Sequence, residues 1–209
     1  MSSVVKVVGV GPGDGKYLCE KAREALINSS VLVGGKRLLQ TFASSEQRVF
    51  SLEEGLEAAV DFICREKHSG EVAVLVSGDP GIFSFAAYLR QYLNREEIEI
   101  IPGISAFQLL FARLCISWQE ASFFSVHGKF PAYLVEAVLE EKISVIFTDS
   151  KWTPSALAQH LMEKGVPDLK AAVGKDLSYP EEEVYRTTLA ELAATQRKEN
   201  NSLLVIFND

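Results

Sequence analysis

Residues 4–13 read VVKVVGVGPG, an apolar run that ends in a loop of glycines and one proline. The run is typical of a buried strand, and the apolar pattern from Tyr17 to Ile27 predicts a helix after the loop. The loop carries few side chains, so another group can approach its main chain closely. Pro12 fixes one φ angle and removes an N–H donor. The loop therefore differs from the dinucleotide and P-loop fingerprints.

The size and charge of the chain favour a globular protein that binds a small ligand. It has 209 residues, 47% of them hydrophobic and 23% charged, which is enough for a conventional core. Its formal net charge of -7 argues against general affinity for nucleic acid or anionic lipid, because both bind through an excess of lysine and arginine. No basic leader segment is visible, and no apolar run approaches the roughly 20 residues of a membrane helix. We therefore expect a cytoplasmic protein.

The cysteines and histidines are too widely spaced to suggest a disulfide framework or a metal site. No Cys-x-x-Cys pair occurs, so we expect buried, reduced thiols and no metal that belongs to the protein itself. The residues are Cys19, Cys64, Cys115, His68, His127 and His160.

Short β-branched runs alternate with helical patterns, which predicts an α/β fold. The expected strands are 4–10, 31–33, 72–76, 98–101, 122–126, 144–148, 171–173, 183–187 and 202–207. The expected helices are 17–28, 53–67, 83–93, 105–114, 132–141, 154–164 and 189–195. Thr153 is the expected N-cap of helix 154–164, with Pro154 in its first turn. The alternation restarts near residue 115, so we expect domains 1–115 and 116–209, with antiparallel strands in the second.

Two more glycine–proline loops follow apolar strands. Residues 77–81 read SGDPG and residues 102–106 read PGISA, where Ser105 is placed to cap the next helix. In an open α/β sheet, ligands bind at the carboxyl ends of the strands. One such loop alone usually means no more than a tight turn. Three of them at strand ends predict a shared binding crevice.

Together these motifs resemble the tetrapyrrole methylases, a family of enzymes that use S-adenosylmethionine. The resemblance rests on residues 7–14 (VVGVGPGD), 77–83 (SGDPGIF) and 102–106 (PGISA), in that order and at those distances. It implies an α/β fold of two domains, each a mixed sheet flanked by helices, with an active-site trough between them. It also implies a homodimer.

Further segments resemble one branch of that family, the enzymes that methylate carbon 5 of a corrin precursor in cobalamin synthesis. Residues 125–129 (SVHGK) resemble a Ser-x-His-Gly-Arg signature, and residues 177–182 (LSYPEE) resemble Leu-Gly-Tyr-Pro-Asp-Glu. Residues 34–38 (GGKRL) also fit the branch. Some relatives continue into a second domain that decarboxylates and methylates carbon 15. This chain resembles the stand-alone cobalt-precorrin-7 type, for which a separate carbon-15 methyltransferase would act next.

The resemblance also implies roles for particular residues. Cobalt would belong to the substrate, and S-adenosyl-L-homocysteine would be the product. His127 is the candidate catalytic residue, since it could take a proton after methyl transfer. The expected cofactor contacts are Pro12, Ser77, Gly78, Asp79, Ile82, Ser105, Ala106, Thr148 and Leu177. The expected substrate contacts are Asp14, Lys36, Arg37, His127 and Lys129.

The chain departs from the family pattern at Gly15, Cys19 and Lys129, where proline, threonine and arginine are usual. Cys19 weakens the expected N-cap of the first helix, and Lys129 replaces a bidentate guanidinium with a point charge.

Alternatives remain for the residues and for the whole chain. Asp79 could be a turn aspartate bonded to its own backbone, Lys36 and Arg37 could be simply solvated, and His127 could be satisfied at a strand end. The chain could act on another substrate of the family, as diphthine synthase or a ribosomal RNA methyltransferase does. It could also bind S-adenosylmethionine without turnover. The His127 and Tyr179 signatures and the acidic balance argue against the diphthine and RNA alternatives.

Overall fold

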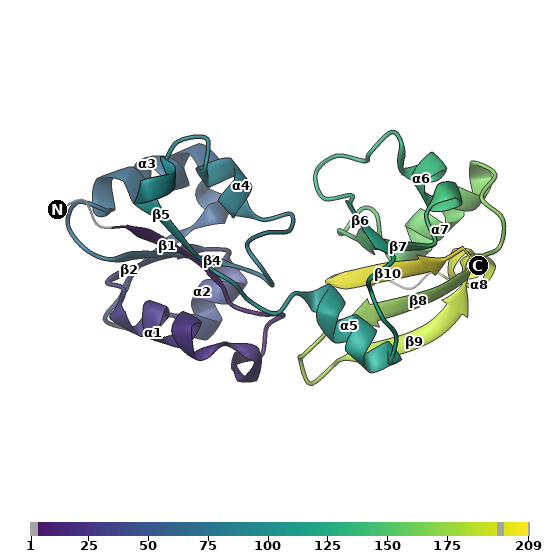
Figure 1. The fold of residues 1–209 in the computed structure, drawn as a ribbon, viewed down its shortest axis with the longest axis horizontal. Coiled ribbons are helices and arrows are strands. Elements are labelled where there is room, and N and C mark those ends of the chain that lie inside the picture. Colours follow the sequence, from purple (N-terminus) through teal and green to yellow (C-terminus); the bar gives the residue numbers. More distant parts are fainter. Residues whose placement is uncertain (1–3, 196–198, 209) are drawn as a thin grey trace. The chain divides into compact units, whose positions relative to one another are not determined.

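The computed structural model describes residues 4–195 and 199–208. The chain divides into two compact units, Met1–Ser105 and Ala106–Asp209 (Figure 1). The sequence placed this division ten residues later, after residue 115. The difference concerns one helix, α5 (Ala106–Leu114), which the structure groups with the second unit.

The first unit contains a five-stranded sheet in the order β3-β2-β4-β1-β5. Every neighbouring pair in it is parallel, although the sequence predicted a mixed sheet in each domain. The reason is that each connection between successive strands contains a helix, which returns the chain to the same edge of the sheet. The strands are β1 (Val5–Gly9), β2 (Val31–Gly34), β3 (Arg48–Ser51), β4 (Val72–Val76) and β5 (Ile98–Ile101).

Helices cover both faces of this sheet (Figure 1). A cluster of buried residues lies on each face of the sheet. On one face Val7, Val33 and Val74 pack against α3 and α4, and on the other Val8 and Leu75 pack against α1 and α2. Since neighbouring residues of a strand point to opposite faces, the apolar runs of the sequence supply both clusters. The helices are α1 (Glu20–Asn28), α2 (Lys36–Phe42), α3 (Leu56–Glu66) and α4 (Phe85–Leu89), with short 3₁₀ turns η1 (Gly15–Tyr17), η2 (Leu52–Glu54) and η3 (Arg95–Glu97).

The second unit contains a mixed sheet in the order β6-β7-β10-β8-β9, as predicted. β6 and β7 are parallel, whereas the other three pairings are antiparallel. The strands are β6 (Ala121–Ser125), β7 (Ile143–Phe147), β8 (Lys170–Lys175), β9 (Glu183–Thr188) and β10 (Ser202–Phe207).

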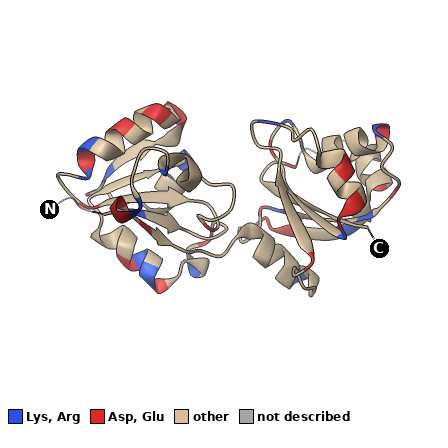
Figure 2. Ribbon diagram, turned by 45° about the horizontal axis from the view of Figure 1, so that its top comes forward, with Lys and Arg blue, Asp and Glu red and all other residues tan. Residues whose placement is uncertain are grey.

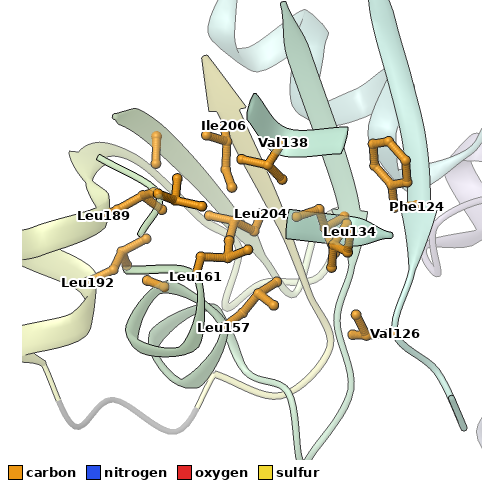
Figure 3. Packing of buried hydrophobic residues seen from close by; sticks show 14 of the residues in the cluster. Phe124, Val126, Leu134, Val138, Leu157, Leu161, Leu189, Leu192, Leu204 and Ile206 are labelled. Carbon is orange, nitrogen blue, oxygen red and sulfur yellow. The ribbon is translucent and has the colours of Figure 1, made fainter. Parts of the chain in front are cut away.

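Helices α6 (Leu134–Glu140), α7 (Pro154–Glu163) and α8 (Leu189–Ala194) cover one face of the second sheet. Thr153 caps α7 as predicted, since its hydroxyl accepts from the Ala156 N–H at 3.3 Å and Pro154 follows it. Leucines of all three helices meet residues of β6 and β10 in one apolar core (Figure 3). The core includes Phe124, Leu134, Val138, Leu157, Leu161, Leu189, Leu192, Leu204 and Ile206.

Contacts on the other face of this sheet explain why α5 belongs to the second unit. The rings of Phe107 in α5 and Phe123 in β6 lie 4.5 Å apart between centroids. The Arg186 guanidinium of β9 donates to the Leu114 carbonyl at 3.1 Å. A Cβ at Gly174 of β8 would come within 2.7 Å of the Leu110 side chain, so α5 lies directly against this strand.

Charged residues lie mainly on the helices and loops of each unit, whereas most strand residues are uncharged (Figure 2). In the described residues no helix is long and apolar enough to cross a membrane. All three cysteines are free thiols, but Cys19 and Cys115 are exposed rather than buried as predicted. Cys19 sits at the N-cap of α1 without a capping side-chain bond, and its thiol points instead toward the Pro102 carbonyl at 3.7 Å.

Candidate functional site

The three glycine–proline loops of the first unit come together at the carboxyl ends of β1, β4 and β5, as predicted. Gly11 and Gly78 pair across two loops: the Gly78 N–H donates to the Gly11 carbonyl at 2.8 Å, and the Gly11 N–H donates to the Gly78 carbonyl at 3.3 Å. Gly9 and Gly103 lie against each other and against the Gly78 carbonyl. We call residues 9–14, 77–83 and 102–105 the loop junction.

Packing between the loops accounts for several of the glycines. A Cβ at Gly9 would come within 2.7 Å of both the Gly103 nitrogen and the Gly78 oxygen, a distance that real Cβ atoms do not reach. Gly78 itself has φ 69°, and a Cβ there would lie 3.3 Å from the Ser105 Cα. These positions need glycine for the approach of one loop to another, so they cannot be replaced without moving the junction.

Asp79 links two of the loops. Its Oδ1 accepts from the Gly81 N–H at 2.7 Å, which is the turn interaction that the sequence left open. Its Oδ2 accepts from the Gly103 N–H at 3.1 Å, and so it also holds the third loop. Asp79 therefore has a structural role in the junction, while its predicted contact with a cofactor stays a prediction.

The other predicted cofactor residues of the first unit lie at the same junction. Pro12 is buried, Ser77 is exposed and Ile82 is half-buried, while Ser105 is only 1% exposed. The edge thus presents main chain and hydroxyl groups, with few charged side chains.

The predicted residues of the second unit gather at one edge of its sheet. Leu203 of β10 is opposite both Phe147 and Gly174, so Thr148 and Leu177 follow strand ends that lie side by side. The Thr148 hydroxyl is buried and bonds the Ser202 carbonyl at 2.6 Å, and Leu177 is 4% exposed. Ala106 is the first residue of α5. The roles of these residues toward a cofactor stay predictions.

His127 lies at the same edge, on the exposed loop after β6. Its Nδ1 is 3.4 Å from the Ser125 hydroxyl, which also accepts from the His127 N–H at 3.3 Å. Lys129 is exposed on the same loop. The histidine is therefore reachable from solvent, which a group that meets a substrate requires.

Asp149, which the sequence did not predict as a site residue, adjoins this loop. Its Oδ1 accepts from the N–H groups of Trp152 and Lys151 at 2.7 and 2.8 Å. The bond from Trp152 is the main cause that lowers its pKa, and the Lys151 bond, the charge of His127 and the Gly128 N–H lower the pKa further. Only the strand register, which places residue 149 beside residue 127, could have revealed it.

Lys36 and Arg37 are exposed at the start of α2, on the same edge of the first sheet. The Lys36 N–H donates to both carboxylate oxygens of Glu53, at 3.0 and 3.1 Å. The Ser51 hydroxyl and this N–H lower the pKa of Glu53. A carboxylate of the chain thus occupies this helix start, and the contacts of Lys36 and Arg37 with a substrate stay predictions. Asp14 caps η1 by accepting from the Lys16 N–H at 2.9 Å.

The 177–182 segment is held by its last glutamate, another role that the sequence did not predict. Glu182 Oε2 accepts from the Ser178 N–H at 2.7 Å, and Oε1 accepts from Arg113 Nε of α5 at 2.6 Å. The Arg113 bond is the first cause that lowers the pKa of Glu182. The signature therefore ties the β8–β9 connection to α5.

In the first unit, glycine-rich loops with few side chains meet at the carboxyl edge of an open parallel sheet, and a mixed α/β unit follows in the sequence. This arrangement is typical of ligand-binding α/β proteins. Residues 4–193 match the family model of the Tetrapyrrole (Corrin/Porphyrin) Methylases. The chain belongs to this family.

Two curated relatives are similar over most of their length. The probable cobalt-precorrin-7 C(5)-methyltransferase of Methanocaldococcus jannaschii is 31% identical over 202 residues, which cover 91% of this chain and 92% of the relative. The cobalt-precorrin-7 C(5)-methyltransferase of Salmonella typhimurium is 29% identical over 182 residues, covering 87% and 89%. Among solved structures, uroporphyrin-III C-methyl transferase from Thermus thermophilus, complexed with S-adenyl homocysteine, has a TM-score of 0.78 at 20% identity, covering 98% of this chain and 97% of that one. This structural likeness concerns the fold.

Proposed function

We propose that the protein is an S-adenosylmethionine-dependent methyltransferase that methylates carbon 5 of a cobalt-precorrin of the cobalt-precorrin-7 type, in cobalamin biosynthesis. The observation that carries the proposal is the loop junction, in which three family motifs meet at the carboxyl edge of one sheet. The names of the two curated relatives support the substrate. The relative that was solved with S-adenyl homocysteine supports the cofactor.

The residues of the junction fit this cofactor. Residues 9–14, 77–83 and 102–105 contain no lysine or arginine, so they do not offer the cations that commonly hold a phosphate. They offer main-chain groups, the Ser77 hydroxyl and two carboxylates, which suit a ligand with a positively charged sulfonium and no phosphate. When bound, S-adenosylmethionine supplies an activated methyl group and its leaving group.

The task of the protein is then chiefly to position the reactants. Holding two reacting atoms about 3 to 3.5 Å apart can remove several kcal/mol of a barrier, which agrees with a site rich in main chain and poor in acid–base residues. Lys36, Arg37 and Lys129 are the cations proposed to bind the carboxylates of the macrocycle. Cobalt would enter only as part of that substrate.

Three further expectations accompany the proposal. A homodimer, a cytoplasmic location and a separate decarboxylating carbon-15 methyltransferase as the next enzyme all stay predictions.

A methyl-transfer assay tests the proposed function. The full chain is incubated with S-adenosylmethionine labelled in the methyl group and with cobalt-precorrin-7, and the label is followed into the macrocycle by mass spectrometry and NMR. We expect one methyl group at carbon 5. A protein that binds S-adenosylhomocysteine in calorimetry but never transfers the label would be a binding module. Transfer to another tetrapyrrole, but not to this one, would change the substrate within the family.

A further inference from the structure

Asp149 and His127 occupy equivalent positions after two paired strands. β6 and β7 are parallel, and Ser125 is in register with Phe147. Pairing continues past the strand ends, because the Val126 N–H donates to the Phe147 carbonyl at 3.0 Å. Adjacent strands lie about 4.8 Å apart, so residues 127 and 149 are neighbours across the two loops.

The carboxylate of Asp149 is held in place by main-chain groups. It accepts two N–H bonds from its own loop, at 2.7 and 2.8 Å from Trp152 and Lys151. These bonds lower its pKa, so the group is ionised at neutral pH. A fixed negative charge therefore lies on the loop next to that of an exposed histidine, and the charge of His127 lowers the pKa of this carboxyl further.

We propose that Asp149 is a positioning residue for His127: its carboxylate orients the imidazole and stabilises the imidazolium that forms when His127 accepts a proton from the methylated macrocycle. This inference rests on the proposed function. The inference adds to the proposed function a residue that acts on the candidate base, His127.

The proton has a defined origin in the proposed reaction. A macrocycle carbon forms a bond to the methyl carbon while the carbon–sulfur bond breaks, and that electron pair stays on sulfur. The macrocycle then carries the positive charge that the sulfonium has lost. Release of one proton to His127 restores the original charge of the macrocycle, and the negative charge of Asp149 on the neighbouring loop stabilises the resulting imidazolium.

The Asp149→Asn variant leaves the other charged and titratable side chains near the pair in place. Lys129 and Lys151 are on the same two loops, and His160 of α7 packs against the rings of Phe130 and Trp152, at centroid distances of 5.0 and 5.1 Å. Asp149→Asn keeps the Oδ1 acceptor for the two main-chain N–H groups. It removes the negative charge beside His127 and weakens the interaction of this side chain with the Gly128 N–H.

NMR of the histidine rings tests the placement without any substrate. The chain has three histidines, so His127→Gln assigns the ring signals of His127 directly. We expect Asp149→Asn to shift the His127 ring nitrogens and to leave those of His68 and His160 in place. Asp168→Asn is the matched control, because Asp168 also accepts a main-chain N–H, from Ala190 at 2.8 Å, away from this loop. An unchanged His127 signal in Asp149→Asn overturns the inference.

Kinetics test the role in the reaction. General acid–base catalysis contributes about 10²- to 10⁴-fold, so we expect His127→Gln to lower kcat roughly 100-fold and Asp149→Asn roughly 10-fold. Affinity for S-adenosylhomocysteine should change less than about twofold. In the double variant, Asp149→Asn should cost nothing beyond His127→Gln, because Asp149 acts through the histidine. Additive losses overturn the inference.

A second pair of variants keeps the inference testable if Asp149→Asn folds poorly. Asp149→Glu and Asp149→Gln are equal in length and differ in charge, and we expect the glutamate to retain more kcat by roughly 5-fold or more. Equal kcat in the two overturns the inference. If the wild-type protein transfers no methyl group at all, the proposed function fails instead, and the NMR result still decides whether Asp149 acts on His127.

Discussion

Ser178 shows how a single residue of a signature can carry strain. Its φ is 76°, in the left-handed region that favours glycine, and it stands where the carbon-5 branch has glycine. Its N–H donates to Glu182, so the hydrogen bond of the segment depends on this conformation. A side chain in this region costs about 1 to 2 kcal/mol, which glycine avoids.

Ser178→Gly is therefore expected to stabilise the protein by about 0.5 to 1 kcal/mol, since part of the relief is offset by the greater freedom of glycine in the unfolded chain. For a chain of this size, that is a rise in Tm of about 1 to 4 °C. Thermal unfolding followed by circular dichroism measures it, with Ser178→Ala as the control that keeps the Cβ. A Tm equal to that of Ser178→Ala would show that the strain is not relieved.

Asp79→Asn tests the link between the second and third loops. The amide can still accept from Gly81 through one oxygen, but its NH₂ group cannot accept from the Gly103 N–H. Loss of the partner of a buried donor costs about 1 to 3 kcal/mol, and the Gly103 N–H is partly buried, so we expect a cost near the lower end. We expect a lower free energy of unfolding and weaker binding of S-adenosylhomocysteine, measured by urea denaturation and calorimetry.

The control for this variant is Asp61→Asn, an exposed aspartate of α3 on the outside of the same unit. It should change neither quantity. Undiminished affinity in Asp79→Asn, with the expected loss of stability, would remove Asp79 from the proposed cofactor site and leave it as a purely structural residue.

At the scale of elements, the ion pair between Glu182 and Arg113 fastens the β8–β9 connection to α5. The pKa of Glu182 is lowered in the folded chain from its ordinary value of 4.5. A group with a lowered pKa stabilises the fold above its unfolded pKa, and that contribution disappears as the pH falls through the folded value. The carboxylate is 19% exposed and its partner 43%, so solvent screens the pair in part.

Glu182→Gln is expected to lose about 1 kcal/mol of stability at pH 7. The gap between variant and wild type should close as the pH falls below the ordinary glutamate pKa of 4.5 and through the lowered pKa of the folded chain, because the wild-type carboxylate then takes up a proton. Urea denaturation at several pH values measures both effects. A gap that stays constant with pH would contradict an electrostatic role.

How much of the structure the sequence predicts also depends on the kind of element. The buried strands β4 and β5 match their expected bounds, because continuous apolar runs between turn residues have one interpretation. The short edge strand β3 and helix α2 were not predicted. Two of the four residues of β3 are exposed and the others half-buried, and α2 has two buried leucines, so neither carries a strong periodic signal.

The candidate site divides in the same way. The glycine–proline loops could be predicted to meet, since strand-end loops of a parallel sheet share an edge. The partners of single side chains could not. That Asp79 reaches Gly103, that Glu53 holds the start of α2 and that Asp149 adjoins His127 all depend on register and loop path, which a single sequence does not specify.

At the scale of the whole molecule, the division between the units follows the contacts of α5. Helix α5 directly follows a motif of the first unit in the sequence, so the sequence pattern assigns it to that unit. In the structure, Leu110 lies against Gly174, Phe107 against Phe123, and Arg186 bonds the last turn of the helix. One face of the second sheet therefore depends on α5 for cover.

This assignment predicts which fragment folds alone. A fragment of residues 106–209 is expected to fold, whereas residues 116–209 should not, because loss of α5 exposes the apolar face on which Leu110 and Phe107 pack. Each such side chain contributes about 1.5 to 3 kcal/mol when fully buried. A typical domain is stable by only about 5 to 15 kcal/mol, so the loss of two such contacts is a large share of the total. Circular dichroism, cooperative urea unfolding and amide NMR dispersion of the two fragments provide the comparison. Equal cooperativity in both fragments would place α5 with the first unit and restore the boundary near residue 115.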